Sequence, residues 1–174
     1  MKNNEFSRPV RLDTIGTQAR AIRIEADETE RKALARRFSL SSLGRLEAEL
    51  NVHSAGEDVV ATGRMQAELV QACVATGAPV PTRIDEAFSL RFRPEGIPEE
   101  GFEVELEADE LDTLFYEGSA VDVGEAVAQT LALALDPYPR ADDAAQALRD
   151  AGVKDESEAG PFGALAGLKD KLGK

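Results

Sequence analysis

Cys73 and His53 are the residues best suited by type to nucleophilic chemistry or zinc binding, because they are the chain's one cysteine and one histidine. A structural zinc ion normally takes four such ligands, so we expect no bound metal and no cofactor. The two side chains could lie close together in the fold and form a Cys–His nucleophilic pair, but the sequence offers no third residue to orient the histidine. The simpler interpretation is that Cys73 is a small buried residue at a strand end and that His53 is solvated.

Six acidic side chains near the middle of the chain could serve a divalent metal ion or acid–base catalysis. They are Glu103, Glu105, Glu107, Asp109, Glu110 and Asp112. Alternation along a strand would put the first three in a row on one face, and no EF-hand spacing is present. We therefore expect a solvated face or a face that docks a partner protein. Phosphate-binding and nucleophile-elbow motifs are absent from the sequence, so we predict no enzymatic activity and no small-molecule substrate.

The excess of negative charge is concentrated in one segment. The chain has 33 Asp and Glu against 20 Lys and Arg, a net charge of −13. Residues 95–136 hold 13 of these acids and no Lys or Arg, so the rest of the chain is nearly neutral. Such a segment repels phosphate backbones and attracts basic partners. The alternative is that the acids only keep a small domain soluble.

Signals for direct RNA contact are few. The candidates are two arginines of a predicted helix and three of a predicted strand: Arg36, Arg37, Arg83, Arg91 and Arg93. Strand alternation puts Arg91 and Arg93 on the face opposite the aromatic residues, which are then core rather than platforms for stacked bases. The arginines could form a strip that touches RNA, or they could pair with neighbouring carboxylates on a solvated face.

Alternating apolar and polar residues predict several strands. These cover Phe6–Val10, Ile15–Ile24, Arg45–His53, Val59–Val74, residues 83–93, Phe102–Glu107 and Leu111–Tyr116. Gly56-Glu57-Asp58 predicts a hairpin turn, and Gly63 is a candidate β-bulge. No β-α-β unit is present, so a parallel sheet is not expected.

Start and stop signals predict the helices. Asp27 can cap a helix over Glu28–Phe38. Asp122 and Glu125 have the spacing of a capping box for a helix over Val123–Leu135, which Pro137 and Pro139 end. A shorter helix is expected over Ala141–Ala151, and an amphipathic tail over Phe162–Leu172 follows a polar linker at Lys154–Gly160.

The expected fold class is α+β. It has an antiparallel, strongly curved sheet or partly closed barrel, with covering helices and a helical C-terminal tail. We expect one domain over residues 1–152 and a linker with an amphipathic tail over 153–174. No apolar run approaches the roughly 20 residues of a membrane helix, and the N-terminus lacks the apolar centre of a signal peptide. A soluble cytoplasmic protein is therefore expected, without membrane contact.

The order and spacing of several motifs resemble the YceD family of large ribosomal RNA subunit accumulation proteins, in its alphaproteobacterial branch. The family pattern is a strand that ends in C-x-x-C-L-x-P, a strand of the type F…L.F, an acidic segment, and a helix of the type D…E…LALP..P. The matching residues here are Cys73, Pro79 or Pro81, Phe88, Leu90, Phe92, Asp122, Glu125, Leu131, Leu133, Leu135, Pro137 and Pro139. Residues 160–169 are also similar to the ending of family members.

The resemblance implies a factor that supports 23S rRNA accumulation or processing and assembly of the large ribosomal subunit. Its partners would be a ribosomal protein or an rRNA maturation factor, and a 23S rRNA precursor is a further candidate. The alternative is a general adaptor that binds a basic partner and has no ribosomal role. Many family members have a second cysteine three residues after the first, and some have further cysteines after the helix prolines, a set that could hold zinc. This chain has Thr76 at the position of the second cysteine and no cysteine after Pro139.

Overall fold

The computed structural model describes residues 4–95 and 112–153, which form an α+β structure with two compact units. The first unit comprises residues 4–71, 81–95 and 112–137, and the second comprises residues 72–80 and 138–153. The predicted strand at Phe102–Glu107, the linker at Lys154–Gly160 and the tail at Phe162–Leu172 lie outside the described residues. No helix within the described residues is long and apolar enough to cross a membrane.

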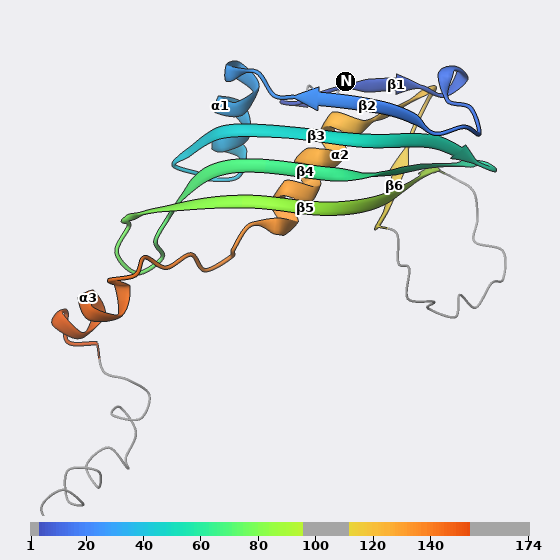
Figure 1. The fold of residues 1–174 in the computed structure, drawn as a ribbon. Coiled ribbons are helices and arrows are strands. Elements are labelled where there is room, and N and C mark those ends of the chain that lie inside the picture. The colour runs from blue at the N-terminus through green and yellow to red at the C-terminus, as the bar shows by residue number, and fades with distance from the viewer. Residues whose placement is uncertain (1–3, 96–111, 154–174) are drawn as a thin grey trace, which may run out of the picture. The chain divides into compact units, whose positions relative to one another are not determined.

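The first unit is built on a five-stranded sheet with strand order β2-β3-β4-β5-β6 (Figure 1). The strands are β2 (Arg20–Glu25), β3 (Ser42–Ala55), β4 (Asp58–Ala72), β5 (Pro79–Pro94) and β6 (Asp112–Tyr116). The pairs β2–β3 and β3–β4 are antiparallel, as predicted. Strands β4 and β5 are neighbours joined by residues 73–78, a connection too short for a parallel crossover.

The last strand of this sheet corrects the prediction of a wholly antiparallel arrangement. Strand β6 pairs with β5 in parallel, with Leu90 opposite Asp112 and Phe92 opposite Leu114. A parallel neighbour requires a crossover of a dozen or more residues, and residues 95–111 provide that length without a β-α-β signature. Among the described strands β2 and β6 form the two edges, so the predicted barrel or strong curvature is not confirmed.

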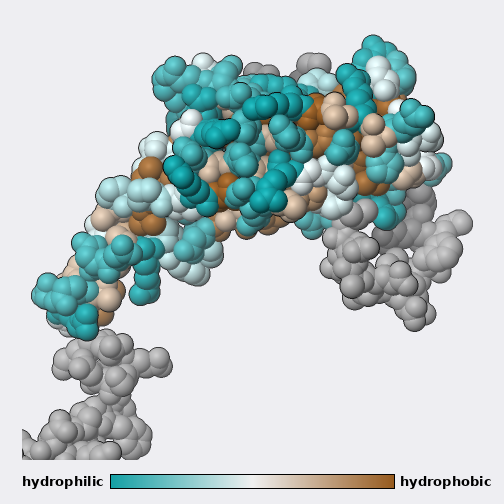
Figure 2. Space-filling model, viewed as in Figure 1, coloured by the Kyte–Doolittle hydropathy of each residue, from teal (hydrophilic) through white to brown (hydrophobic). Residues whose placement is uncertain are grey.

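Helix α2 (Val123–Ala134) crosses one face of the sheet, and its apolar side chains share a core with the strands (Figure 1). The inward set predicted for β3, namely Leu46, Ala48, Leu50 and Val52, is confirmed as buried. Val127 and Leu131 of α2 belong to the same cluster and are fully buried. Burying a side chain of this size stabilises the fold by about 1.5–3 kcal/mol. Hydrophilic residues predominate over the strands on the opposite face, which Figure 2 shows.

The predicted bulge at Gly63 is wrong. The β3–β4 register runs without interruption through the Leu50–Gly63 pair, and it shifts instead between Leu43 and Arg45. A side chain at Gly63 would collide with the Glu49 carbonyl oxygen and place its Cβ 2.8 Å from Leu50 Cα. Glycine is therefore required at position 63 by close strand packing rather than by an extra residue.

Helix α1 (Glu28–Arg37) begins with a complete capping box. The Asp27 carboxylate accepts the Glu30 N–H at 2.9 Å, and the Glu30 carboxylate accepts the Asp27 N–H at 2.8 Å. The helix ends in a Schellman motif, with Ser39 at a positive φ of 54° and the Leu40 N–H donating to the Ala35 carbonyl. The predicted cap and bounds are confirmed to within one residue.

Asp122 joins the N-terminal segment to the start of α2. It ends β7 (Ala120–Asp122), which pairs antiparallel with β1 (Pro9–Arg11), and a 3-10 turn (Leu12–Thr14) follows β1. Its carboxylate accepts the N–H groups of Gly124 and Glu125 at 3.1 Å and that of Arg8 at 2.8 Å. The Ser7 hydroxyl donates to it at 2.7 Å. Asp122 is thus the predicted N-cap, but the predicted reciprocal bond from Glu125 is absent because the Glu125 carboxylate binds Arg37.

The second unit contains the turn after β4 and helix α3 (Ala144–Asp150). The turn is closed by the Cys73 N–H, which donates to the Ala78 carbonyl, and by the Gly77 N–H, which donates to the Cys73 carbonyl, each at 2.8 Å. The Val74 N–H donates to the Pro139 carbonyl at 2.9 Å and so ties the turn to the segment that follows α2. The helix predicted over Ala141–Ala151 is confirmed in its central part.

Replacing Gly124 with alanine should destabilise the first unit. A Cβ at Gly124 would lie 2.6 Å from the Phe6 carbonyl oxygen and 2.9 Å from the Arg8 nitrogen, both main-chain atoms that cannot swing aside. We expect Gly124→Ala to lower the free energy of unfolding by about 1–3 kcal/mol in urea denaturation. Gly16→Ala is the control, because the nearest atom to a Cβ there is 4.0 Å away. Equal stability of the two variants would contradict this account.

Replacing Asp122 with alanine should cost about 1–3 kcal/mol of unfolding free energy, since several partly buried donors lose their acceptor. The matched control is Asp143→Ala, because Asp143 occupies the N-cap of α3 without a side-chain hydrogen bond. Hydrogen bonds from the Arg8 N–H, the Ser7 hydroxyl and other donors lower the pKa of Asp122 despite its burial. Its contribution should therefore be complete above the ordinary value of 3.8 and be lost as the pH falls further. A pH-independent difference between wild type and Asp122→Ala would refute the assignment.

Candidate functional site

The predicted acidic face falls mostly outside the described residues. Glu103, Glu105, Glu107, Asp109 and Glu110 lie there, and only Asp112 is described. Asp112 is the first residue of β6 and is exposed opposite Leu90 of β5. The structure therefore places one member of the predicted set on the surface and leaves the grouping of the others a prediction.

Two further carboxyl groups flank this segment and lie against each other. The Glu95 N–H donates to the Tyr116 carbonyl at 3.0 Å, which brings Glu95 beside residue 117. A hydrogen bond with Glu117, together with the repulsion of its charge, raises the pKa of the Glu95 carboxyl. Both side chains are exposed, so water screens the repulsion without removing it. Neither residue stood out in the sequence, where the only signal was the lack of any Lys or Arg from 95 to 136.

The pKa of Tyr116 reflects the negative charge around it at the same end of the sheet. Burial raises the pKa of its phenol, and the negative charges of Asp58 and Glu57 raise it further. Asp58 is itself compensated by arginines, whereas Glu95 and Glu117 come from a segment that contains no basic residue. A segment that carries negative charge and no basic residue can attract a basic partner and orient it for docking.

The arginines predicted to form a strip on β5 are all engaged by carboxylates. Arg91 and Arg93 both approach Asp58, with nitrogen–oxygen distances of 3.7 and 3.3 Å. Arg83 lies 3.6 Å from Glu68 of the neighbouring strand. Phe92, on the opposite face, is buried in the core, as predicted. The sequence left two alternatives for these arginines, a strip that touches RNA and a solvated face paired with carboxylates. The observed ion pairs are those of the second alternative.

The two arginines predicted on the first helix differ sharply. Arg37 makes a bidentate pair with Glu125 at 2.7 and 2.8 Å and also donates to Glu5 at 3.0 Å. Its hydrogen bond to Glu125 is the main cause that raises the pKa of Arg37 and lowers that of Glu125. Arg36 is exposed and has no ion pair among the described residues. Of the five arginines predicted to contact RNA, Arg36 alone could bind a phosphate without first breaking an ion pair among the described residues.

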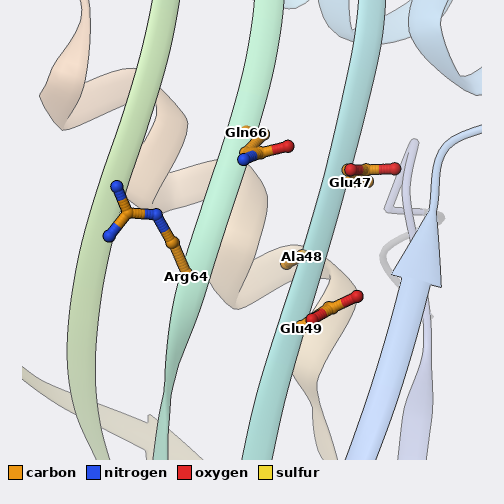
Figure 3. Close-up of a pocket in the computed structure, with 5 residues that line it drawn as sticks. All are labelled: Glu47, Ala48, Glu49, Arg64 and Gln66. Carbon is orange, nitrogen blue, oxygen red and sulfur yellow. The ribbon is translucent and has the colours of Figure 1, made fainter.

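The polar face of the sheet continues this pattern of compensation. Arg23 pairs with Glu47 and Glu49, and Arg64 of β4 pairs with Asp85 of β5. Figure 3 shows Glu47, Glu49, Arg64 and Gln66 on the face of the sheet away from α2. The depression that they line measures about 120 Å³, below the 300–1,000 Å³ of typical ligand pockets. A larger open groove of about 440 Å³ lies where β3, β4 and β5 carry Ser42, Val70, Pro81 and Arg83.

Cys73 and His53 do not form a nucleophilic pair. His53 is opposite Val60 near the beginning of β4, whereas Cys73 follows the end of that strand. Cys73 is buried, as predicted, with an exposed fraction of 3%. His53 is half-buried rather than solvated, and its Nδ1 has no hydrogen-bond partner among the described residues.

The surroundings of Cys73 do not fit a metal ion. The thiol receives a hydrogen bond from the Thr76 hydroxyl and others from the backbone N–H groups of Ala141, Ala75 and Thr76. These donors lower the pKa of Cys73 from 9.0 to about 7. Residues 4–95 and 112–153 contain no group of three or more His, Cys, Asp or Glu side chains that could hold a metal ion. The sulfur is thus surrounded by donors rather than by further ligands.

Neutralising Arg37 and its neighbour Arg36 should have unequal effects on stability. Arg37→Gln leaves Glu125, whose side chain is 16% exposed, without its bidentate partner and should lower the unfolding free energy by about 1–2 kcal/mol. Arg36→Gln should change it by less than about 0.5 kcal/mol, as expected for an exposed side chain without such a contact. Thermal and urea denaturation of both variants measure this difference. A loss at Arg36 as large as that at Arg37 would contradict the assignment.

Comparison with known proteins identifies the family. The family model described as "Large ribosomal RNA subunit accumulation protein YceD" matches residues 61–169, which is more than half of the chain. No curated protein matches the chain, and no solved structure matches it. The residues that carried the resemblance, from Cys73 to Pro139, all lie within the matched range. The chain therefore belongs to the YceD family of large ribosomal RNA subunit accumulation proteins.

Proposed function

We propose that this chain is a non-enzymatic factor that supports 23S rRNA accumulation and assembly of the large ribosomal subunit by contacting a basic protein through its acidic segment. The family description supports the ribosomal role. The charge distribution supports the mode of contact, since every Lys and Arg of the chain lies outside residues 95–136. Large-subunit ribosomal proteins and rRNA maturation factors that carry basic patches are partners of the required sign.

The observation that carries the proposal is the contact between Glu95 and Glu117. The Glu117 carboxyl, held beside Glu95 at the border of the acidic segment, raises the pKa of Glu95 through a hydrogen bond and through its charge. A cationic side chain placed between them would relieve this repulsion, so binding of a basic partner gains free energy there. The predicted contacts at Glu103, Glu105, Glu107, Asp109, Glu110 and Asp112 would extend the same surface.

Direct RNA contact is the smaller part of the proposal. It rests on Arg36, Arg37, Arg83, Arg91 and Arg93. Four of the five are bound to carboxylates. An RNA phosphate would have to displace those carboxylates before it could pair with the arginines and release its own counterions. Arg36 is the exception. The geometry therefore favours a protein partner, with rRNA captured through that partner.

A general adaptor with no ribosomal role is the second candidate function, because an acidic surface suits any basic partner. The depression of about 120 Å³ between β3 and β4 is smaller than typical ligand pockets, and the groove of about 440 Å³ beside Ser42 and Arg83 is open to solvent rather than enclosed. The two candidates share the acidic docking surface and differ in which partner occupies it. Capture from cells separates them.

Affinity capture of the tagged full-length chain at low and high salt tests the proposal. We expect ribosomal proteins or maturation factors with large-subunit rRNA precursors at low salt, and their loss at high salt, where the Debye length falls to about 3 Å. Glu95→Gln/Glu117→Gln should weaken the capture, and Glu103→Gln/Glu105→Gln/Glu107→Gln should weaken it further. Glu49→Gln/Glu86→Gln is the matched control, because it removes two exposed negative charges outside the acidic segment.

Equal weakening by the control pair would mean that net charge alone matters and would contradict a localised docking surface. Capture of a single non-ribosomal protein without rRNA would favour the adaptor. Capture of rRNA that survives removal of proteins and is lost in Arg36→Gln would contradict contact through a protein partner.

A further inference from the structure

Phe115 is an aromatic side chain that the fold leaves exposed on strand β6. Its exposed fraction is 65%, whereas its strand neighbours Leu114 and Tyr116 are partly buried and pack against the core. Successive side chains of a strand point to opposite faces, so Phe115 lies on the face of the sheet away from that core. An exposed aromatic ring is a surface on which a side chain of a partner can dock.

Two carboxyl groups lie next to this ring. Glu117 follows Phe115 by two residues, so in extended backbone the two side chains point to the same face, about 7 Å apart. The Glu95 N–H donates to the Tyr116 carbonyl at 3.0 Å, which continues the β5–β6 pairing from the Arg93–Phe115 level to Glu95 and Glu117. Both glutamates are exposed. The ring therefore has two negatively charged neighbours on its own side of the sheet.

The arginines of β5 nearest to Phe115 are drawn away from the ring. Arg93 is opposite Phe115 in the register, and its guanidinium lies 3.3 Å from the carboxylate of Asp58 in β4. Arg91 lies 3.7 Å from the same carboxylate. Strand β5 separates β4 from β6, so Asp58 attracts both guanidinium groups toward the side opposite β6. The ring keeps its exposure and can receive a cation supplied by a partner.

We propose that Phe115, Glu95 and Glu117 form a docking site for an arginine side chain of the basic partner. The guanidinium stacks on the Phe115 ring and donates hydrogen bonds to the two carboxylates. The face of an aromatic ring carries partial negative charge, and the planar, weakly hydrated guanidinium stacks on it better than the ammonium group of lysine. The inference rests on the proposed contact with a basic protein and adds which side chain of that protein is recognised.

A base of single-stranded RNA is the other group that could stack on an exposed ring. The carboxylates of Glu95 and Glu117 disfavour that ligand, because they repel the phosphates on either side of the base. The same carboxylates attract a guanidinium. The charge around Phe115 therefore favours an arginine of a protein over a base of RNA.

Binding of two peptides of equal charge to the full-length chain tests the site. The probes are fluorescein-labelled nona-arginine and nona-lysine, and fluorescence anisotropy at low salt gives both dissociation constants. We expect the wild type to prefer nona-arginine. Phe115→Leu keeps an apolar side chain but removes the ring, and it should reduce this preference about two- to fivefold. Phe115→Tyr keeps the ring and should retain the preference.

Tyr138→Leu is the matched control, because Tyr138 is an aromatic side chain outside the site with an exposed fraction of 73%. It should leave the preference unchanged. Equal binding of the two peptides to the wild type, an unchanged preference in Phe115→Leu, or an equal drop in Tyr138→Leu would overturn the proposal. So would nona-uridine RNA that binds the wild type and loses affinity in Phe115→Leu, since a base would then occupy the ring.

These outcomes are distinct from failure of the proposed function. If capture from cells yields no ribosomal partner while the peptide preference still depends on Phe115, the ribosomal role is wrong and the arginine site stands. If capture depends on Glu95 and Glu117 while the preference does not depend on Phe115, the arginine site alone is wrong.

Discussion

The fold of the first unit depends on the half-buried carboxylate of Asp122. It ends β7, caps α2 and accepts hydrogen bonds from the N-terminal segment, so three stretches of chain meet at one side chain. Gly124 allows the Phe6 carbonyl to approach the helix, and Arg37 of α1 reaches Glu125 one residue later. The sheet supplies the buried area, but this junction decides where α2 begins and therefore which of its faces packs on the strands.

Most positive charges of the folded body are paired with nearby negative charges. The arginines of the sheet and of α1 are mostly bound to nearby carboxylates, so the folded body presents little free positive charge to a phosphate backbone. The segment after β5 lacks any basic residue, and its border holds two carboxyl groups against each other. A factor built in this way is suited to attract basic proteins, which are abundant among the components of a large ribosomal subunit in assembly.

Much of this architecture could be predicted from the sequence. Alternation located β3, β4 and β5 and the inward set from Leu46 to Val52, and the caps at Asp27 and Asp122 located two helices. The parallel position of β6 could not be predicted, because strand direction after a long connection is set by tertiary packing rather than by local pattern. Gly63 signalled an irregularity, but close packing and a bulge use the same residue type. The pairing of Arg91 and Arg93 with Asp58 and the Glu95–Glu117 contact both join residues distant in sequence, which periodicity does not reveal.

We propose that the chain supports accumulation of large-subunit rRNA through its acidic surface. The most direct measurement is the ratio of 23S to 16S rRNA, with the ribosome sedimentation profile, in cells that lack the chain and are complemented with defined variants. We expect a reduced ratio and incomplete large subunits in cells without the chain. The wild type and Glu49→Gln/Glu86→Gln should restore both, whereas Glu95→Gln/Glu117→Gln combined with Glu103→Gln/Glu105→Gln/Glu107→Gln should not. Normal rRNA ratios in the deletion, or full rescue by the neutralised acidic segment, would contradict it.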